Sequence, residues 1–145
     1  MTAGQLPRLG VADTLVRTAH RVQRIFADVS RSFDLTPQQA QLLCRLTEGA
    51  MTMTELCAAL NLEKSSLTGL VDRIEARSLV HRIRHPQDRR MVRVDLTGEG
   101  AKLAHAVHDA VAGSLDALVA RLAGTDDATI TAALTPLVTD NTTNA

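Results

Sequence analysis

The sequence predicts a mainly α-helical fold with one small β-hairpin near its middle. Over most of the 145 residues, apolar side chains recur at steps of three and four, which is the spacing of amphipathic helices. At residues 91–96 the period changes to two, with Val92, Val94 and Leu96 separated by charged residues. Residues 85–89 have turn composition and follow a second β-branched run at 79–84. The predicted order is α-α-α-α-β-β-α-α.

Length and composition favour a single globular domain over residues 1–145. The chain is 45% hydrophobic and 22% charged, and its length supports one core but not two. No apolar run approaches the roughly 20 residues that a membrane-spanning helix needs. The first ten residues lack the charged start and apolar block of a secretory signal. We therefore expect a cytoplasmic protein.

Two helices are expected at the start of the chain. The first, over about residues 8–34, carries one stripe of apolar residues: Leu15, Ala19, Val22, Phe26, Val29 and Phe33. The second opens at Thr36, where Pro37 suits the first helical position and Gln39 completes a capping box. It is expected to stop near Gly49.

The middle of the chain predicts a helix-turn-helix followed by the hairpin. Thr52 and Glu55 form a second capping box, which opens a short helix that breaks at Asn61. A further helix follows over about residues 63–77. Two short helices joined by so tight a turn are the helix-turn-helix arrangement. With the hairpin behind them they form a winged helix-turn-helix lobe, at about residues 36–100.

The end of the chain predicts a long helix and a shorter one. The long helix starts after Thr97, and the last starts near Thr125, with Pro136 inside it predicting a kink or an early end. Residues 140–145 should fray. The central unit is too small to cover the stripes of the first helix and of the long helix. We therefore expect a two-fold homodimer through the terminal helices, about residues 8–34 and 100–140.

The charges are unevenly distributed although the formal net charge is zero. Residues 63–93 hold eight basic side chains against four acidic ones, whereas residues 94–145 hold two basic against seven acidic. Such asymmetry suggests that one face meets an anionic partner, and a merely solvated charged face is the alternative.

The pieces at residues 67–75, 79–80, 88–90 and 96–100 (LTGLVDRIE, LV, DRR and LTGEG) together resemble the MarR family signature. The resemblance covers nearly the whole chain. It implies a winged-helix homodimer that acts as a transcriptional repressor on a palindromic duplex operator and is released by a small ligand or an oxidant. Two positions depart from the family pattern. Gly69 stands where the family often has Arg, and Ser78 stands where it tends to have Gly.

The candidate DNA-binding residues lie on the second helix of the motif and on the hairpin. In this architecture the second helix enters the major groove by its N-terminus, and its dipole favours a nearby phosphate. The resemblance implies that Arg90 enters the minor groove and that Asp88 orients a neighbouring Arg; narrow minor grooves attract arginine. Arg73 would contact a phosphate or tie down the hairpin. The full expected set is Lys64, Ser65, Ser66, Thr68, Arg73, Arg84, Asp88, Arg89 and Arg90.

Other functions have less support in the sequence. No catalytic motif is found, so no enzyme and no cofactor is expected. Only two aromatic residues are present, which disfavours single-stranded nucleic acid. A winged-helix module that binds a protein partner stays open. So does a metal or thiol sensor of the same fold, through His105 and His108 or through Cys44 and Cys57.

The resemblance also implies a small-molecule effector, of anionic or phenolic type. In this family ligands tend to sit where the dimer helices meet the DNA-binding lobe. Here that region would include Arg24, Arg45 and the start of the long helix. No ligand-binding residue is assigned from the sequence.

Overall fold

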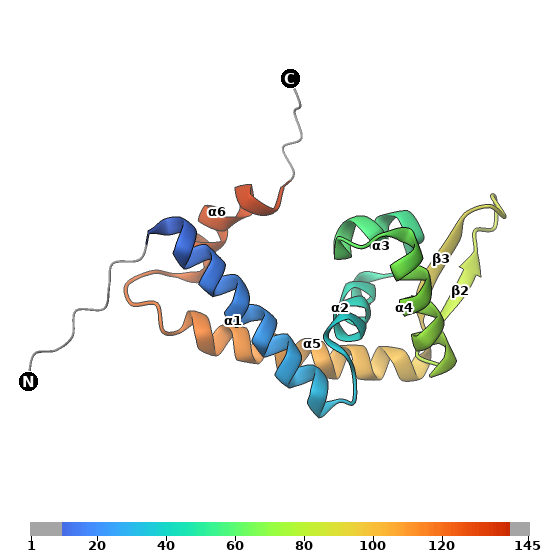
Figure 1. Cartoon of the computed structure of the whole chain (residues 1–145), viewed down its shortest axis with the longest axis horizontal. Helices are drawn as coiled ribbons and strands as arrows, with labels where there is room; N and C mark the ends of the chain where they lie inside the picture. The colour runs from blue at the N-terminus through green and yellow to red at the C-terminus, as the bar shows by residue number, and fades with distance from the viewer. Residues whose placement is uncertain (1–9, 140–145) are drawn as a thin grey trace, which may run out of the picture. The chain divides into compact units, whose positions relative to one another are not determined.

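The computed structural model describes residues 10–139, and these form two compact units, one up to Leu115 and one from Asp116 onward. The first helix begins at Val11 and the last ends at Val138, close to the expected bounds near residues 8 and 140, and the tail expected to fray at 140–145 lies outside the described residues. The expectation of one domain stays a prediction. The elements follow in the order α1 (Val11–Ser32), α2 (Pro37–Arg45), the 3-10 helix η1 (Leu46–Glu48), β1 (Met51–Thr52), α3 (Met53–Leu60), α4 (Lys64–Ala76), β2 (Val80–Arg84), β3 (Val92–Leu96), α5 (Gly98–Val119) and α6 (Asp127–Val138) (Figure 1).

Both predicted capping boxes are present. The hydroxyl of Thr36 accepts the backbone N–H of Gln39 at 3.2 Å, and the Gln39 side chain accepts the N–H of Thr36 at 3.1 Å. Thr52 and Glu55 exchange the same pair of bonds at 3.1 and 2.8 Å. Each box satisfies two of the N–H groups that a helix start leaves without partners. The break after α3 falls at Asn61, which adopts the left-handed conformation with φ 52°.

The core of the first unit lies among α2, α3, α4, the sheet and the first half of α5. Its largest fully buried side chains come from all of these elements: Leu42, Leu43, Leu46, Leu56, Leu67, Leu70, Val71, Ile74, Val80, Val94 and Val107. The lobe therefore has a closed apolar core, to which each of these elements contributes buried side chains.

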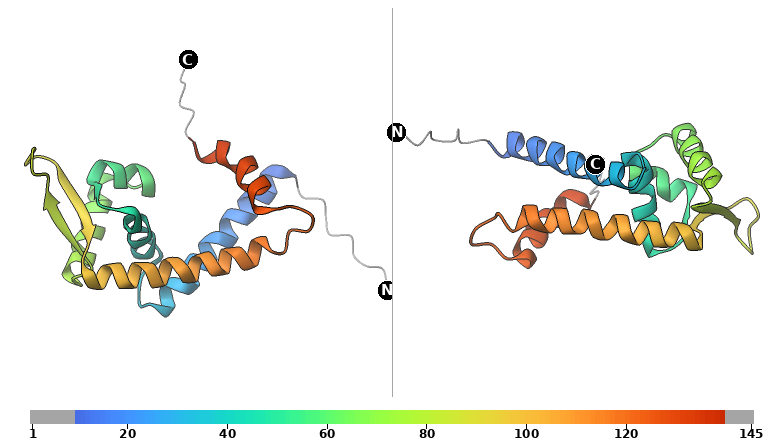
Figure 2. Two further views of the ribbon diagram at one scale, coloured as in Figure 1. Left: turned by 180° about the vertical axis from the view of Figure 1, so that it is seen from behind. Right: turned by 90° about the horizontal axis from the view of Figure 1, so that it is seen from below.

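The hairpin of β2 and β3, here called the wing, belongs to a sheet with one strand more than predicted. β2 and β3 pair antiparallel from Val80–Leu96 to Arg84–Val92, as expected from the alternation. The two-residue strand β1 pairs with the other edge of β3, with Met51 opposite Val94, and gives the order β1-β3-β2. A strand of two residues has no periodicity, so the sequence pattern could not reveal it. Figure 2 shows the hairpin extending away from the helices of this unit.

The start of α5 is held against the connection between α4 and β2. The backbone N–H of Thr97 donates to the carbonyl of Leu79 at 3.1 Å, and the Thr97 hydroxyl donates to that of Ser78 at 2.6 Å. A Cβ atom on Gly100 would lie 1.7 Å from the Leu79 carbonyl oxygen. Only glycine therefore permits this approach of helix to backbone.

The helix stripes are only partly free for a partner, which corrects the expectation that the lobe could not cover them. Phe26 and Val29 of α1, and Phe33 directly after it, pack against the core, and Ala104, Val107 and Val111 of α5 belong to it. The beginning of α1 is uncovered, with Val11 79%, Leu15 44% and Val16 52% exposed. The first helix α1 thus divides into an end that packs against the lobe and a beginning that leaves apolar side chains exposed.

The second unit contains the end of α5 and α6. Asp126 caps α6, and its carboxylate accepts the backbone N–H of Thr129 at 2.7 Å. The helix passes through Pro136 and ends two residues later, at Val138, so the expected early end falls within its last turn. Leu134 and Leu137 are 48% and 65% exposed. The described helices include none that combines the length and the apolar character needed to span a bilayer.

Candidate nucleic-acid interface

The outer face of α4 carries the polar residues that were predicted from the sequence to bind DNA. Leu67, Leu70, Val71 and Ile74 are buried on its inner face. Lys64, Ser65, Ser66 and Thr68 are exposed on the first turns, and the Thr68 hydroxyl donates to the Lys64 carbonyl at 2.8 Å. This bond leaves the lone pairs of the hydroxyl oxygen free to accept. The helix therefore presents hydroxyl groups and one ammonium group at its N-terminal end.

Arg73 lies on the same outer face, two turns further along. Ser65, Gly69 and Arg73 follow at steps of four, which places them in one row on the helix. A Cβ atom on Gly69 would lie 3.4 Å from Nη1 of Arg73, so the guanidinium reaches back over the glycine. The row therefore keeps a cation close to where the family often has Arg. In the described part of the chain no hydrogen bond joins Arg73 to the hairpin.

The hairpin tip is organised by backbone hydrogen bonds and by Asp88. Its carboxylate accepts the backbone N–H of Arg90 at 3.0 Å, and the N–H of Met91 donates to the Asp88 carbonyl at 3.0 Å. Asp88 thus shapes the turn, and no ion pair is found for it within residues 10–139. Its bidentate contact with an Arg stays a prediction. The side chains of Arg84, Arg89 and Arg90 are exposed.

Arg82 joins the wing to α4, a contact that the sequence pattern did not predict. Its guanidinium donates to Glu75 at 2.8 Å and to Asp72 at 2.6 Å, and its backbone N–H donates to Glu75 at 3.1 Å. Burial alone would lower the pKa of Arg82, but the hydrogen bonds and charges of the two carboxylates outweigh it and raise the pKa. The spacing of 7 and 10 residues between partners matches no local pattern, which is why the pair was missed.

This pairing changes the charge balance of the face. Arg82 compensates Asp72 and Glu75, the two acidic residues within α4. Within residues 10–139, no carboxylate lies within ion-pair distance of Arg73, Arg84, Arg89, Arg90 or Arg93. The surface formed by α4 and the hairpin therefore keeps several exposed cations whose charge is not neutralised by the protein.

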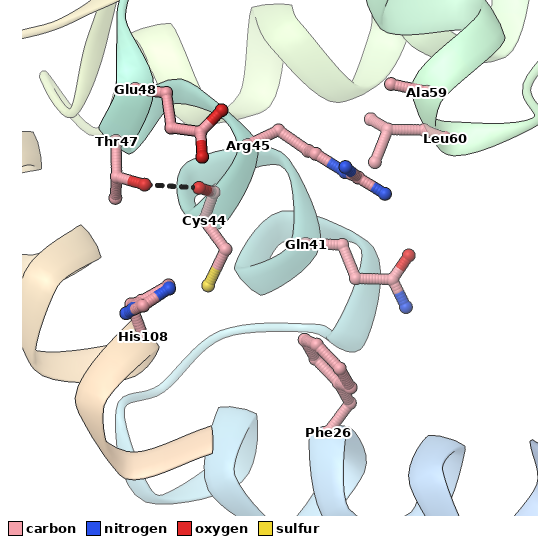
Figure 3. Close-up of a pocket in the computed structure, with 9 residues that line it drawn as sticks. All are labelled: Phe26, Gln41, Cys44, Arg45, Thr47, Glu48, Ala59, Leu60 and His108. Atoms are coloured by element: carbon pink, nitrogen blue, oxygen red, sulfur yellow. Dashed lines mark hydrogen bonds between the residues drawn. The ribbon is translucent and has the colours of Figure 1, made fainter. Parts of the chain in front are cut away.

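A cleft of about 350 Å³ lies between α1, α2, α3 and α5 (Figure 3). Its lining is mixed, with Phe26 and Leu60 as apolar groups and Arg45, Glu48 and His108 as ionisable ones. In Figure 3 Arg45 extends along the side of Ala59 and Leu60, while Cys44 points toward the side of His108. Of the region expected for an effector, the cleft includes Arg45 but neither Arg24 nor the start of α5.

The structure gives little support to the alternatives of a thiol sensor or a metal sensor. Cys44 is half-buried, and burial raises the pKa of its thiol although the neighbouring Arg45 opposes the shift. A raised pKa disfavours the reactive thiolate. His105 and His108 are exposed, and Nδ1 of His108 lies 3.8 Å from Asp109. Across residues 10–139 no three His, Cys, Asp or Glu side chains come together as a metal site would require.

Comparison with known proteins gives the same family that the sequence resembles. The MarR family model matches residues 33–91. The HTH-type transcriptional repressor NicR of Pseudomonas putida is 37% identical over 95 residues, 64% of this chain and 60% of that protein. The MarR family regulator SPO1453 of Silicibacter pomeroyi is 30% identical, with a TM-score of 0.75 over 88% of this chain and 91% of that one. NadR in complex with 4-hydroxyphenylacetate is 25% identical, with a TM-score of 0.76 over 92% and 95%.

The fold and the exposed basic face define a winged helix-turn-helix protein. The chain belongs to the MarR family. Its sequence matches span 53% to 60% of the length of three of its curated relatives, all named as transcriptional regulators or multiple antibiotic resistance proteins.

Proposed function

We propose that this chain is a transcriptional repressor that binds a palindromic duplex operator as a homodimer, and that it acts by binding rather than by catalysis. The observation that carries the proposal is the exposed N-terminal end of α4 beside the hairpin. Apart from Arg82, the hairpin arginines (Arg84, Arg89, Arg90 and Arg93) have no carboxylate partners in the described residues. Lys64, Ser65, Ser66, Thr68 and Arg73 would contact the major groove and its phosphates. Arg90 would enter the minor groove, with Arg84 and Arg89 on phosphates and Asp88 shaping the turn.

The homodimer is supported by the apolar surface at the start of α1. Val11, Leu15 and Val16 are each at least 44% exposed although they are large hydrophobic residues. Several large apolar side chains exposed at one end of a helix are typical of a contact face. Two copies would also present two α4 helices to two operator half-sites, as a palindrome requires.

An anionic aromatic effector is supported by the cleft. Arg45 and His108 offer cationic or hydrogen-bonding groups beside the ring of Phe26, which suits a small carboxylate or phenolate. The similar protein NadR has been solved with 4-hydroxyphenylacetate. With this compound as the probe, release of DNA from the wild type and its loss in Arg45→Gln would support the cleft as the effector site. If 4-hydroxyphenylacetate releases DNA from neither the wild type nor Arg45→Gln, this compound is not an effector of the protein.

The test is a fluorescence anisotropy titration of the duplex upstream of the gene for this chain, at two salt concentrations. We expect tight binding that weakens steeply with salt, because phosphate contacts release counterions. Arg90→Ala should cost about 1–3 kcal/mol of operator binding, with the dimer unchanged in sedimentation. Leu15→Ala, in the proposed dimer face, is the contrasting variant and should weaken the dimer first.

Two outcomes would contradict the proposal. Unchanged operator affinity in Arg90→Ala would remove the wing from the mechanism. Binding no stronger than to random DNA at low salt, from a sample shown to be dimeric, would favour a module that binds a protein partner.

A further inference from the structure

We propose that Arg82 is a positioning residue, which locks the wing onto α4 through Asp72 and Glu75 rather than contacting DNA itself. The inference rests on the proposed function, since its consequence is the placement of the hairpin arginines on duplex DNA. It separates Arg82 from the other basic residues of the hairpin, which the sequence alone groups together.

The register of the hairpin places Arg82 on the face of the sheet that turns inward. Val80, Arg82 and Arg84 share one face because side chains alternate along a strand. Val80 is 1% exposed, and Val94, directly opposite Arg82, is 0% exposed. The side chain of Arg82 is 28% exposed, and that of Asp72 is 60% exposed. The guanidinium is thus directed toward α4, and it is shielded much more than the outer carboxylate.

The contact spans two separate elements. Glu75 holds both the backbone N–H and the guanidinium of Arg82, and Asp72, one turn earlier on α4, holds the other guanidinium nitrogen. The planar guanidinium with its several donors is suited to bridge two carboxylates in this way. Three hydrogen bonds therefore fix one point of β2 to α4, ahead of the segment where the hairpin leaves the lobe.

The contact matters because the DNA-facing groups lie on both sides of it. Ser65, Ser66 and Thr68 are on α4, and Arg89 and Arg90 are at the hairpin tip. A hairpin by itself is marginally stable, so its direction depends on what holds its base. If the lock is lost, part of the binding free energy is spent on ordering the wing, and affinity falls without loss of a phosphate contact.

The test is DNA affinity and its salt dependence in Arg82→Gln and in the double variant Asp72→Asn with Glu75→Gln. The two possible roles of Arg82, positioning the wing or contacting phosphate, predict opposite changes of DNA affinity in the double variant. Removing two negative charges near DNA should strengthen binding if Arg82 merely contacts phosphate. Because the lock is lost, we expect both variants to weaken binding about tenfold at high salt, where charge effects are screened.

Arg84→Gln is the matched comparison on the same strand face. As a proposed phosphate contact it should lower the salt slope by about one, whereas Arg82→Gln should leave the slope of the wild type unchanged. A lower slope in Arg82→Gln, together with tighter binding by the double variant, would overturn the proposal. Arg82→Lys keeps the charge but not the fork, so it should recover only part of the affinity.

Amide hydrogen exchange of the free protein tests the lock without DNA. Exchange of the β2 and β3 amides should be about tenfold faster in Arg82→Gln and in the double variant, while α2 exchanges as in the wild type. Unchanged hairpin exchange would overturn the lock. If the wild type binds no duplex, the proposed function fails, and this measurement still decides whether Arg82 holds the wing.

Discussion

The lobe and the outer parts of the terminal helices treat the same residue type in opposite ways. Leu42, Leu43 and Leu56 in the lobe are 0% exposed, whereas Leu15 in α1 and Leu137 in α6 are 44% and 65% exposed. All five belong to apolar patterns on helices. The difference shows that one chain completes the hydrophobic core of the lobe, while its ends keep apolar surface that only a further contact would cover.

The comparison also separates two sources of helix stability. An isolated helix of 12 residues, the length of α6, is marginal in water and relies on caps and local pairs. A lobe helix gains most of its stability from its buried face. Changes in the lobe should therefore alter global unfolding, whereas changes at the ends should alter association or local order.

The largest effect is expected from Leu43→Ala in α2. Deleting this fully buried side chain should lower the free energy of unfolding by about 3 kcal/mol, from lost transfer free energy and the cavity left behind. Urea denaturation at two protein concentrations measures it. The loss should be independent of concentration. Leu15→Ala is the matched control, and its effect should grow where the dimer is populated. Equal losses of unfolding free energy in the two variants, independent of protein concentration, would contradict the difference between the lobe and the helix ends.

A smaller loss is expected from Gly100→Ala at the start of α5. The added Cβ would collide with the Leu79 carbonyl, so helix and connection must move apart, at a cost of about 2 kcal/mol. Gly113→Ala is the control in the same helix, because nothing lies within 4 Å of its added Cβ. That variant should gain up to about 1 kcal/mol from helix propensity. Thermal unfolding of both variants measures these changes in stability. A Gly100→Ala variant as stable as the wild type would contradict the close approach of helix and connection.

Ser78→Gly should stabilise the lobe by about 1 kcal/mol. Ser78 follows α4 with φ 59°, a left-handed conformation that costs a residue with a Cβ and costs glycine nothing. The same change at Ser114, inside α5, should destabilise by about 0.5 kcal/mol. Denaturation midpoints of the two variants should thus move in opposite directions. A shared direction would mean that the backbone at Ser78 is not strained.

The smallest effect concerns the pH dependence of α6. The backbone N–H of Thr129, aided by its side chain, holds the pKa of Asp126 below its usual value. The cap therefore stabilises α6 above the ordinary Asp pKa of about 3.9 and is lost as the pH falls further through the lowered pKa. The NMR signal of the Thr129 amide should follow this loss. Asp126→Asn should remove the pH dependence, because its amide caps without titrating.

Local chemistry explains how much could be predicted from the sequence. The capping boxes at Thr36 and Thr52, the break at Asn61 and the pairing of β2 with β3 were predicted, since each depends on neighbours within a few residues. The exposed positions of Lys64 and Arg90 were also anticipated from their places on a helix start and a turn. Their contacts with DNA stay predictions.

The sequence by itself determined the helical and strand periods, the caps, the turn positions and the asymmetry of charge, because these follow from the order of residue types along the chain. Only the tertiary structure decided which part of each long stripe is buried. It also showed that β1 joins the sheet, that Gly100 permits a backbone contact, and that Arg82 is paired whereas Arg84 has no ion-pair partner within residues 10–139. These depend on which distant segments meet, and the free energy of burial and pairing exists only once they do.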